Sequence, residues 1–255
     1  MPKRPESDLE IPLKERKNIG ERILGEVDPK GMSRAEFEKS SDLLFHGSSK
    51  SFEFRPVFDY RSESYIREQD GSTTLGFGFY TSDSREEASQ YSRVRQGGKP
   101  NESFVTPILP FKARVLDLRW KDDQTRNAPF PLELVEAWRV AFFEYFRNRK
   151  PREGNVGMIL DSSEVEYAAY LERVVKLKAV DLRTLLETAP APEVKSRNLP
   201  SPYWTILFSE FMLAQGYDGL VYNEGGEGWQ SHGPSYVFYN LKKIGTYDSW
   251  QKEET

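Results

Sequence analysis

Cysteine is absent from the 255-residue sequence, and histidine occurs only twice, as His46 and His232. Without thiols the chain can form no disulfide, no thiolate metal site and no cysteine nucleophile. Two histidines are also too few for a histidine-rich metal centre, so we expect no metal cofactor.

Long apolar runs and a strong charge of one sign are also missing. No stretch approaches the ~20 apolar residues of a membrane-spanning helix, so we expect no membrane partner. The first residues, MPKRPESDLEIPLKERK, lack the apolar core of a secretory signal. We therefore expect a cytoplasmic protein, or one delivered into a target cell without a cleaved signal. The formal net charge of −4 indicates no global affinity for nucleic acid.

The composition and the order of predicted elements favour one soluble α+β domain. Hydrophobic residues make up 37% and charged residues 30% of the chain, which is long enough to bury a core. Residues 1–31 are charged and poor in large apolar side chains, and predict a flexible arm. The domain then covers 32–255, with short strands at both ends and a helical insertion at about 121–200.

Hydrophobic patterns and capping residues predict the individual elements. Short apolar or aromatic runs predict strands at 43–46, 76–81, 219–222 and 235–239, and strands broken by Pro107 and Pro110 within 103–119. Capping signals and helical spacing predict helices at 33–39, at 85–91 after Ser82 or Ser84, at 131–149, at 162–187 and from 201 to about 215.

Short motifs follow one another in an order that is more informative than any of them alone. They are LLFHGS at 43–48, GFYT at 78–81, AxxY at 88–91 and SYVFY at 235–239. Each by itself is more often a core strand or a surface helix than a site. Together they resemble the ADP-ribosyltransferase superfamily, in the branch of diphtheria toxin and the poly(ADP-ribose) polymerases, over about 43–92 and 204–245.

The resemblance implies a split β-sandwich of two antiparallel sheets around a cleft for NAD⁺, the co-substrate. His46 matches the family histidine that hydrogen-bonds the adenosine-side ribose. Gly47 matches the residue whose backbone clamps the nicotinamide carboxamide, and Ser48 the hydroxyl that binds the same amide. Tyr80 and Tyr91 match the rings on the two faces of nicotinamide, a flat cation that aromatic faces stabilise. His46 and Tyr80 are thus expected to be catalytic as well as to bind NAD⁺.

The sequence departs from the family pattern at Ser235, where a glutamate usually stands. That glutamate orients the ribose 2′-hydroxyl and stabilises the positive charge of the transition state. A serine can hydrogen-bond the ribose but supplies no charge. Glu224, and after it Glu227, are the candidate replacement acids; the alternative is that both are solvated loop charges.

Two further segments match family regions with variable roles. The loop at 55–75 lies where the family has a donor-site lid, and Arg61, with Arg55 and Arg67, is expected to reach the NAD⁺ diphosphate. The loop before the last strand helps to select the acceptor in the family, and Trp229 at its tip is a candidate anchor for a base or a protein side chain.

The function implied by the resemblance is mono-ADP-ribosyl transfer from NAD⁺ to a macromolecular acceptor, with release of nicotinamide. The acceptor is a protein, RNA or DNA, and the class suggests a bacterial or phage toxin or effector with an antitoxin or inhibitor protein as partner. Ser235 motivates the alternative of a catalytically inactive module that binds NAD⁺ or ADP-ribose. An RNA 2′-phosphotransferase and a purely structural domain rank lower.

Overall fold

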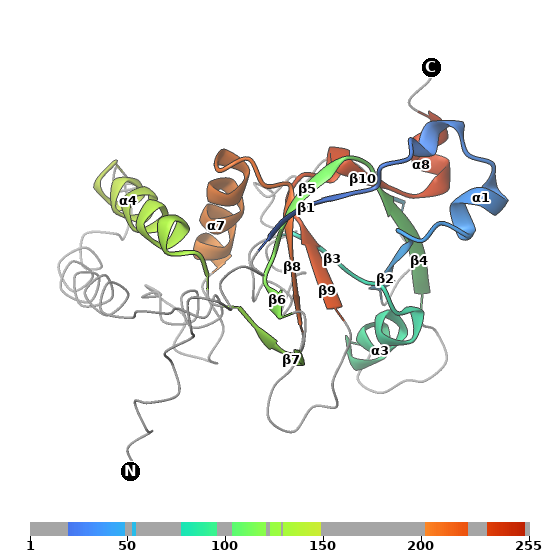
Figure 1. Ribbon diagram of the computed structural model, residues 1–255, viewed down its shortest axis with the longest axis horizontal. Coiled ribbons are helices and arrows are strands. Elements are labelled where there is room, and N and C mark those ends of the chain that lie inside the picture. The colour runs from blue at the N-terminus through green and yellow to red at the C-terminus, as the bar shows by residue number, and fades with distance from the viewer. Residues whose placement is uncertain are drawn as a thin grey trace, which may run out of the picture.

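The computed structural model describes residues 20–48, 53–54, 78–95, 104–120, 123–128, 130–148, 202–223 and 234–252. Most of the described strands form an eight-stranded sheet in the order β1-β5-β8-β9-β3-β2-β4-β10 (Figure 1). These strands are β1 (Gly20–Leu24), β2 (Leu44–Ser48), β3 (Phe79–Ser82), β4 (Phe104–Pro110), β5 (Ala113–Asp117), β8 (Gly219–Asn223), β9 (Pro234–Phe238) and β10 (Ile244–Gly245).

A two-stranded sheet and several helices complete the described structure. The small sheet pairs β6 (Arg119–Trp120) with β7 (Asp123–Asn127). The helices are α1 (Arg34–Glu38), α3 (Arg85–Arg95), α4 (Leu132–Asn148), α7 (Pro202–Ala214) and α8 (Tyr247–Lys252), with short 3₁₀ turns η3 (Pro29–Gly31) and η4 (Leu241–Lys243). The predicted α+β class is confirmed. None of the described helices is both long and apolar enough to cross a bilayer.

Local capping explains where three helices begin or end, as predicted. At α1, Ser33 Oγ accepts from the Glu36 N–H, and the Glu36 carboxylate accepts from the Ser33 N–H at 2.7 Å, a complete capping box. At α3, Ser84 Oγ accepts from the Glu87 N–H at 3.2 Å. After α7, Gly216 adopts φ +82°, the left-handed conformation that glycine accepts readily.

Strands β5 and β8 run parallel, although the sequence predicted only antiparallel sheets. Val115, Leu116 and Asp117 pair in parallel with Gly219, Leu220 and Val221. The chain between the two strands includes α4 and α7, and such a long crossover can return a strand in the same direction. The prediction of two wholly antiparallel sheets is therefore wrong at this pair.

The predicted arm is too long at its C-terminal end. Residues 20–24 form β1, which pairs with β5 from Gly20↔Asp117 to Leu24↔Ala113. This is an edge strand with only Leu24 deeply buried, so its sequence is polar enough to look like an arm. Residues 20–31 thus belong to the fold, whereas 1–19 lie outside the described residues.

Pro107 does not interrupt β4, contrary to the break predicted at this residue, whereas β4 ends at Pro110, where the second break was predicted. It pairs with Phe45 of β2, and because proline has no N–H this must be a non-hydrogen-bonded position of the ladder. The Pro107 nitrogen therefore faces away from β2, on the side where β10 reaches only Leu109 and Pro110. A proline with its nitrogen on an open strand edge costs no ladder hydrogen bond.

The two larger of the three hydrophobic cores among the described residues lie on opposite faces of the sheet. The inner core is built almost entirely by the strands, from β1 at one edge of the sheet to β10 at the other, so the sheet curls around it. Its members are Leu24, Leu44, Phe54, Phe79, Ile108, Ala113, Val115, Val221, Tyr236, Phe238, Leu241 and Ile244. The helical core packs α4 and α7 on the outer face, and includes Leu134, Val135, Trp138, Leu207, Phe208, Phe211, Met212, Leu220, Tyr222, Val237 and Tyr239.

The predicted insertion is described only in its first part. The helix predicted at 131–149 is confirmed as α4, and the one predicted from 201 to about 215 is confirmed as α7. Residues 151–200, with the helix predicted at 162–187, lie outside the described residues.

Candidate functional site

Strands β2 and β3 are joined at a single register position and diverge beyond it. Within the described chain the only β2–β3 pair is Phe45↔Ser82, whereas β2 pairs with β4 over its whole length. The β2–β3 divergence, defined by residues 46–48 of β2 and 79–81 of β3, thus separates two parts of the same sheet. Three of the predicted site residues, His46, Gly47 and Ser48, line it from β2.

The backbones of Gly47 and Tyr80 both face the β2–β3 divergence. Phe45 is a non-hydrogen-bonded partner of Pro107, so the backbone N–H and C=O of Phe45 and Gly47 point away from β4 and toward β3. On β3, the backbone N–H and C=O of Ser82 point toward β2. Those of Tyr80, two residues earlier on the strand, point the same way. The backbone N–H and C=O of Gly47 therefore point toward β3, at a position where β2 and β3 are no longer paired.

His46 bridges the diverging strands with its side chain. Its Nδ1 lies 2.7 Å from the Tyr80 carbonyl oxygen. A carbonyl only accepts, so Nδ1 carries the hydrogen and donates it, and Nε2 of the neutral ring is an acceptor. The ring also stacks on Phe79, with centroids 4.2 Å apart and planes 28° apart. These contacts fix the orientation and the tautomer of a half-buried imidazole.

Gly47 allows helix α3 to approach β2 closely. A Cβ at this position would overlap the carbonyl oxygen of Ala88 and lie 2.7 Å from its carbonyl carbon. Gly47 faces away from His46, so α3 crosses β2 on the outer face of the sheet. From the sequence alone, only the approach of a ligand explains this glycine. The structure shows a second requirement, which the sequence did not reveal because it depends on a helix 41 residues away in the chain.

Tyr80 lies on the same outer face as Gly47 and is half-buried against the helical core. Tyr91, the second predicted ring, belongs to α3, less than one turn after Ala88. The backbone of α3 therefore passes the β2–β3 divergence on the side where Tyr80 lies. The structure brings together the strand positions of His46, Gly47, Ser48 and Tyr80 and the helix that carries Tyr91.

Ser235 is the first buried residue of β9 and is paired on both sides. It lies opposite Ser82 of β3 and opposite Tyr222 of β8, and only 4% of its surface is exposed. Ser82 is 2% exposed, and its Oγ donates to the Glu87 carboxylate at 2.7 Å. The position at which the sequence resemblance implies a glutamate thus holds a buried serine pair, and a carboxylate from α3 reaches that pair.

Glu87 is not among the site residues that the sequence predicts. In the sequence Glu87 is one of several charged residues at the start of a surface helix, and nothing distinguishes it from its neighbour Glu86. Only the pairing of β3 with β9, which lies more than 150 residues further along the chain, shows that Ser82 and Glu87 belong near Ser235.

A second group of charged residues lies near Ser235, at the end of β5. Arg119 donates from Nε and Nη2 to the Asp117 carboxylate at 2.8 and 2.6 Å, a bidentate pair with side chains 24% and 17% exposed. Burial raises the pKa of the nearby Asp83 carboxyl, and the charge of Glu87 raises it further, while Arg119 opposes the shift. Burial likewise raises the pKa of Tyr236, against the opposing charge of Arg119.

Replacing Asp83 by Asn is expected to stabilise the fold slightly at neutral pH. The folded-state pKa lies above the ordinary value of 3.8, so ionising Asp83 opposes folding. The gain in the free energy of unfolding from Asn is complete above the raised pKa of Asp83. It shrinks as the pH falls through that pKa, and it vanishes below the ordinary pKa of 3.8. We expect less than about 0.5 kcal/mol, because the carboxyl is only partly removed from water and solvent screens most of the effect. Thermal unfolding near pH 7 and pH 3 measures this, with Glu86→Gln as control; a lower Tm at pH 7 would contradict it.

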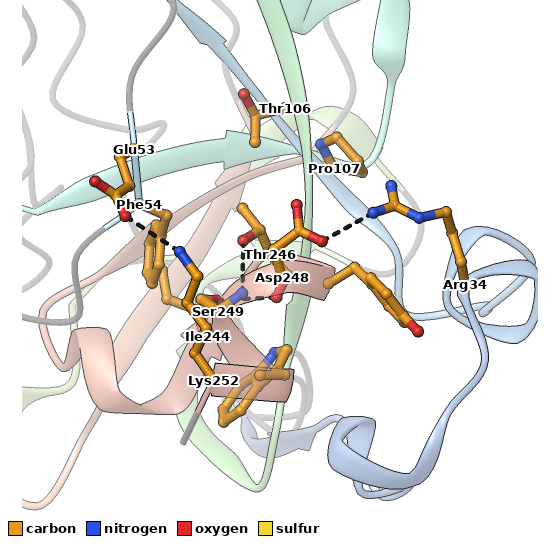
Figure 2. Close-up of a pocket in the computed structure, with 12 residues that line it drawn as sticks. Arg34, Glu53, Phe54, Thr106, Pro107, Ile244, Thr246, Asp248, Ser249 and Lys252 are labelled. Atoms are coloured by element: carbon orange, nitrogen blue, oxygen red, sulfur yellow. Dashed lines mark hydrogen bonds and ion pairs between the residues drawn. The ribbon is translucent and has the colours of Figure 1, made fainter. Parts of the chain in front are cut away.

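A cavity of about 570 Å³ lies at the open edge of β4, beside α1 and α8 (Figure 2). Its rim charges form two pairs, Arg34 with Asp248 at 2.8 Å and Lys252 with Glu53 at 3.3 Å. The other lining residues are aromatic, aliphatic or hydroxyl-bearing: Phe54, Thr106, Pro107, Ile244, Thr246, Tyr247, Ser249 and Trp250. Since two cations meet two carboxylates, the cavity has no excess charge with which to select an ionic ligand.

The cavity adjoins the His46 side of β2 but contains none of the predicted site residues. Thr106, which lines it, pairs with His46 across the β2–β4 ladder. Phe54, also in its wall, meets Phe79 edge-on at 5.4 Å, and Phe79 stacks on His46.

Several predicted site residues lie outside the described residues. These are Glu224, Glu227, Trp229, Arg55, Arg61 and Arg67, together with the side chain of Tyr91. Their proposed roles therefore stay predictions. Among the side chains that the structure describes, no group of histidines and carboxylates is gathered as metal ligands would be.

Comparisons with protein-family models, with curated proteins and with solved structures found no match for this chain.

Proposed function

We propose that this protein is a mono-ADP-ribosyltransferase that uses NAD⁺ as co-substrate and releases nicotinamide. The observation that carries the proposal is the meeting of His46, Gly47 and Tyr80 at the β2–β3 divergence. The resemblance of their sequence motifs to the ADP-ribosyltransferase superfamily supports the same function.

The backbone of Gly47 suits the nicotinamide carboxamide. That amide has one N–H₂ group to donate and one oxygen to accept, and Gly47 directs one C=O and one N–H to the β2–β3 divergence. Ser48 follows with a hydroxyl that can join the same amide. A tyrosine face on the cationic ring contributes about 0.5–2 kcal/mol, so Tyr80, and Tyr91 from α3, would hold it by stacking.

His46 suits a ribose hydroxyl rather than a proton-transfer role. Because its Nδ1 donates to the Tyr80 carbonyl, Nε2 of the neutral ring has the acceptor character that a sugar hydroxyl requires. Stacking on Phe79 keeps this nitrogen in one orientation. His46 is thus proposed to position NAD⁺, while Tyr80 contacts the reacting end.

The sheet itself supports the proposed split β-sandwich. The single Phe45↔Ser82 pair divides the strand order into β1-β5-β8-β9-β3 and β2-β4-β10. Side chains of both parts meet in the inner core, for example Phe238 and Val221 with Leu44 and Ile108. We propose that the two parts act as the two sheets of the family fold, with NAD⁺ bound where they separate.

The reaction breaks the bond between C1′ of the ribose and the nicotinamide nitrogen. The electron pair leaves with nicotinamide, which becomes neutral, and C1′ becomes oxocarbenium-like, as in glycoside cleavage. An acceptor oxygen or nitrogen then bonds to C1′ and loses its proton. The acceptor class, whether protein, RNA or DNA, and a toxin or effector role with an inhibitor protein as partner, are part of the proposal through the resemblance alone.

Incubation with NAD⁺ labelled in the adenylate, in the presence of cell lysate, tests this function. We expect nicotinamide release and transfer of label to macromolecules. Protease and nuclease digestion of the labelled product then identifies the acceptor class. A heat-unfolded sample is the control, and absence of both NAD⁺ binding and nicotinamide release would remove the proposal.

The buried, uncharged Ser235 supports one second candidate, a catalytically inactive module that binds NAD⁺ or ADP-ribose. It predicts a different result in the same experiment. NAD⁺ would bind, and His46→Ala would weaken this binding, but neither nicotinamide nor labelled product would appear.

A further inference from the structure

Cleavage of the nicotinamide–ribose bond places positive charge on the sugar, and enzymes that cleave glycosidic bonds oppose it with a carboxylate. Ser235, at the strand position where the family resemblance expects this charge, has none. We infer that Glu87 of α3 supplies the missing carboxylate. This inference rests on the proposed function and identifies a catalytic residue for it.

The first support is the contact between Glu87 and the buried serine pair. Ser82 Oγ donates to Glu87 Oε2 at 2.7 Å, and Ser82 lies directly opposite Ser235 in the β3–β9 ladder. Side chains at such paired positions have Cβ atoms about 4.5–5.5 Å apart. The Glu87 carboxylate therefore lies one hydrogen bond from the side chain that neighbours Ser235.

The second support is the face of the sheet on which the carboxylate lies. Tyr80 and Ser82 are two residues apart on β3, so their side chains lie on the same face of the sheet, the outer one. Helix α3 crosses the same face, where its Ala88 lies against Gly47. Glu87, Tyr80 and the backbone of Gly47 are therefore grouped around the β2–β3 divergence, and Tyr91 follows one turn further along α3.

The third support is that the other described carboxylates nearby have different surroundings. Asp117 is engaged by both Nε and Nη2 of Arg119. Asp83 lies just beyond the end of β3, where its carboxyl is close enough to Glu87, Arg119 and Tyr236 for their charges to act on it. Glu86 is exposed. Only Glu87 among them contacts the serine pair.

The proposed step conserves charge and atoms. As the C1′–N bond breaks, its electron pair goes to nicotinamide, and the positive charge of the ribose is opposed by the Glu87 carboxylate. The acceptor atom then bonds to C1′, and its proton passes to Glu87 and from there to water. With water as acceptor the products are nicotinamide, ADP-ribose and a proton.

Glu87→Gln tests the inference because the amide oxygen still accepts from Ser82, while the charge is lost. We expect kcat for nicotinamide release to fall by about 10²–10³-fold, the usual loss when one electrostatic contact to the transition state is removed. The Kd for NAD⁺ should change less than about threefold, because ground-state binding is kept. Glu86→Gln, an exposed neighbour on the same helix, is the matched control and should turn over normally.

Ser235→Glu in the Glu87→Gln background is the decisive second variant, since it restores a carboxylate on the adjacent strand. We expect it to recover at least about tenfold of the lost kcat, one decade of the electrostatic term. Wild-type turnover by Glu87→Gln overturns the inference. So does a loss of NAD⁺ affinity as large as the loss of kcat, if Ser235→Glu does not restore kcat. So does a loss confined to Glu224→Gln or Glu227→Gln. If the wild-type protein neither binds nor cleaves NAD⁺, the proposed function itself fails, and this inference with it.

Discussion

Replacing Gly47 by alanine should displace helix α3, destabilise the fold and abolish measurable NAD⁺ binding. The new Cβ would overlap the Ala88 carbonyl oxygen, which is backbone and cannot rotate away. Overfilling a packed site costs about 1–3 kcal/mol. The helix or the strand must move to relieve the overlap, and both belong to the proposed site. Chemical denaturation and equilibrium NAD⁺ binding measure the two effects.

Gly31→Ala is the matched control for this substitution. Gly31 also lies in a short regular segment, but a Cβ there would meet nothing within 4 Å. We expect it to leave stability within about 0.5 kcal/mol and NAD⁺ binding intact. If Gly47→Ala is as stable as Gly31→Ala, α3 does not press on β2 as described. If Gly47→Ala is destabilised but binds NAD⁺ normally, the stability result stands and the NAD⁺ site must lie elsewhere.

Residue patterns predicted the elements whose signals are local. Helix α1 follows its Ser33–Glu36 capping box, and α7 ends at Ala214, two residues before Gly216 takes the left-handed conformation. Both boundaries depend only on nearby residues. The aromatic run of β9 is apolar because it is buried in the middle of the sheet. Elements of this kind can be read from a few consecutive residues.

The incorrect predictions concern features that depend on distant partners. Strand β1 looks like a polar arm because it forms an edge and obtains its stability from β5. Pro107 appears to be a strand breaker until its partner Phe45 shows that no hydrogen bond is lost. The parallel pairing of β5 with β8 likewise depends on a crossover of about 100 residues, for which no local pattern exists.

The candidate site divides in the same way. Gly47 and Tyr80 belong to short motifs, so the sequence alone could suggest their proposed role in binding NAD⁺. Glu87 has no motif of its own, because its proposed role depends on contact with Ser82 and on the pairing of Ser82 with Ser235. The sequence could show that Ser235 stands where the resemblance implies a carboxylate, but not which carboxylate of another element lies near it.

Replacing Trp138 by alanine should be among the most destabilising single changes in the chain. Trp138 is fully buried in the helical core, where it meets Phe208 edge-on at 5.4 Å and Phe211 at 5.3 Å. Removing a large buried ring costs about 3–5 kcal/mol, from lost burial and from the cavity that remains. Guanidinium unfolding curves of the two proteins measure the difference.

Val140→Ala is the control on the same helix, because Val140 is 51% exposed and should lose less than about 0.5 kcal/mol. The comparison also tests what the helical insertion does. An appended lid would unfold separately, so Trp138→Ala would produce a second transition and leave the main one in place. The contacts of Trp138 with α7, and of α7 with Tyr239 beside β9, instead predict one cooperative transition that shifts as a whole. A shifted single transition would mean that α4 supports the outer face of the strands that carry Ser235 and Tyr80.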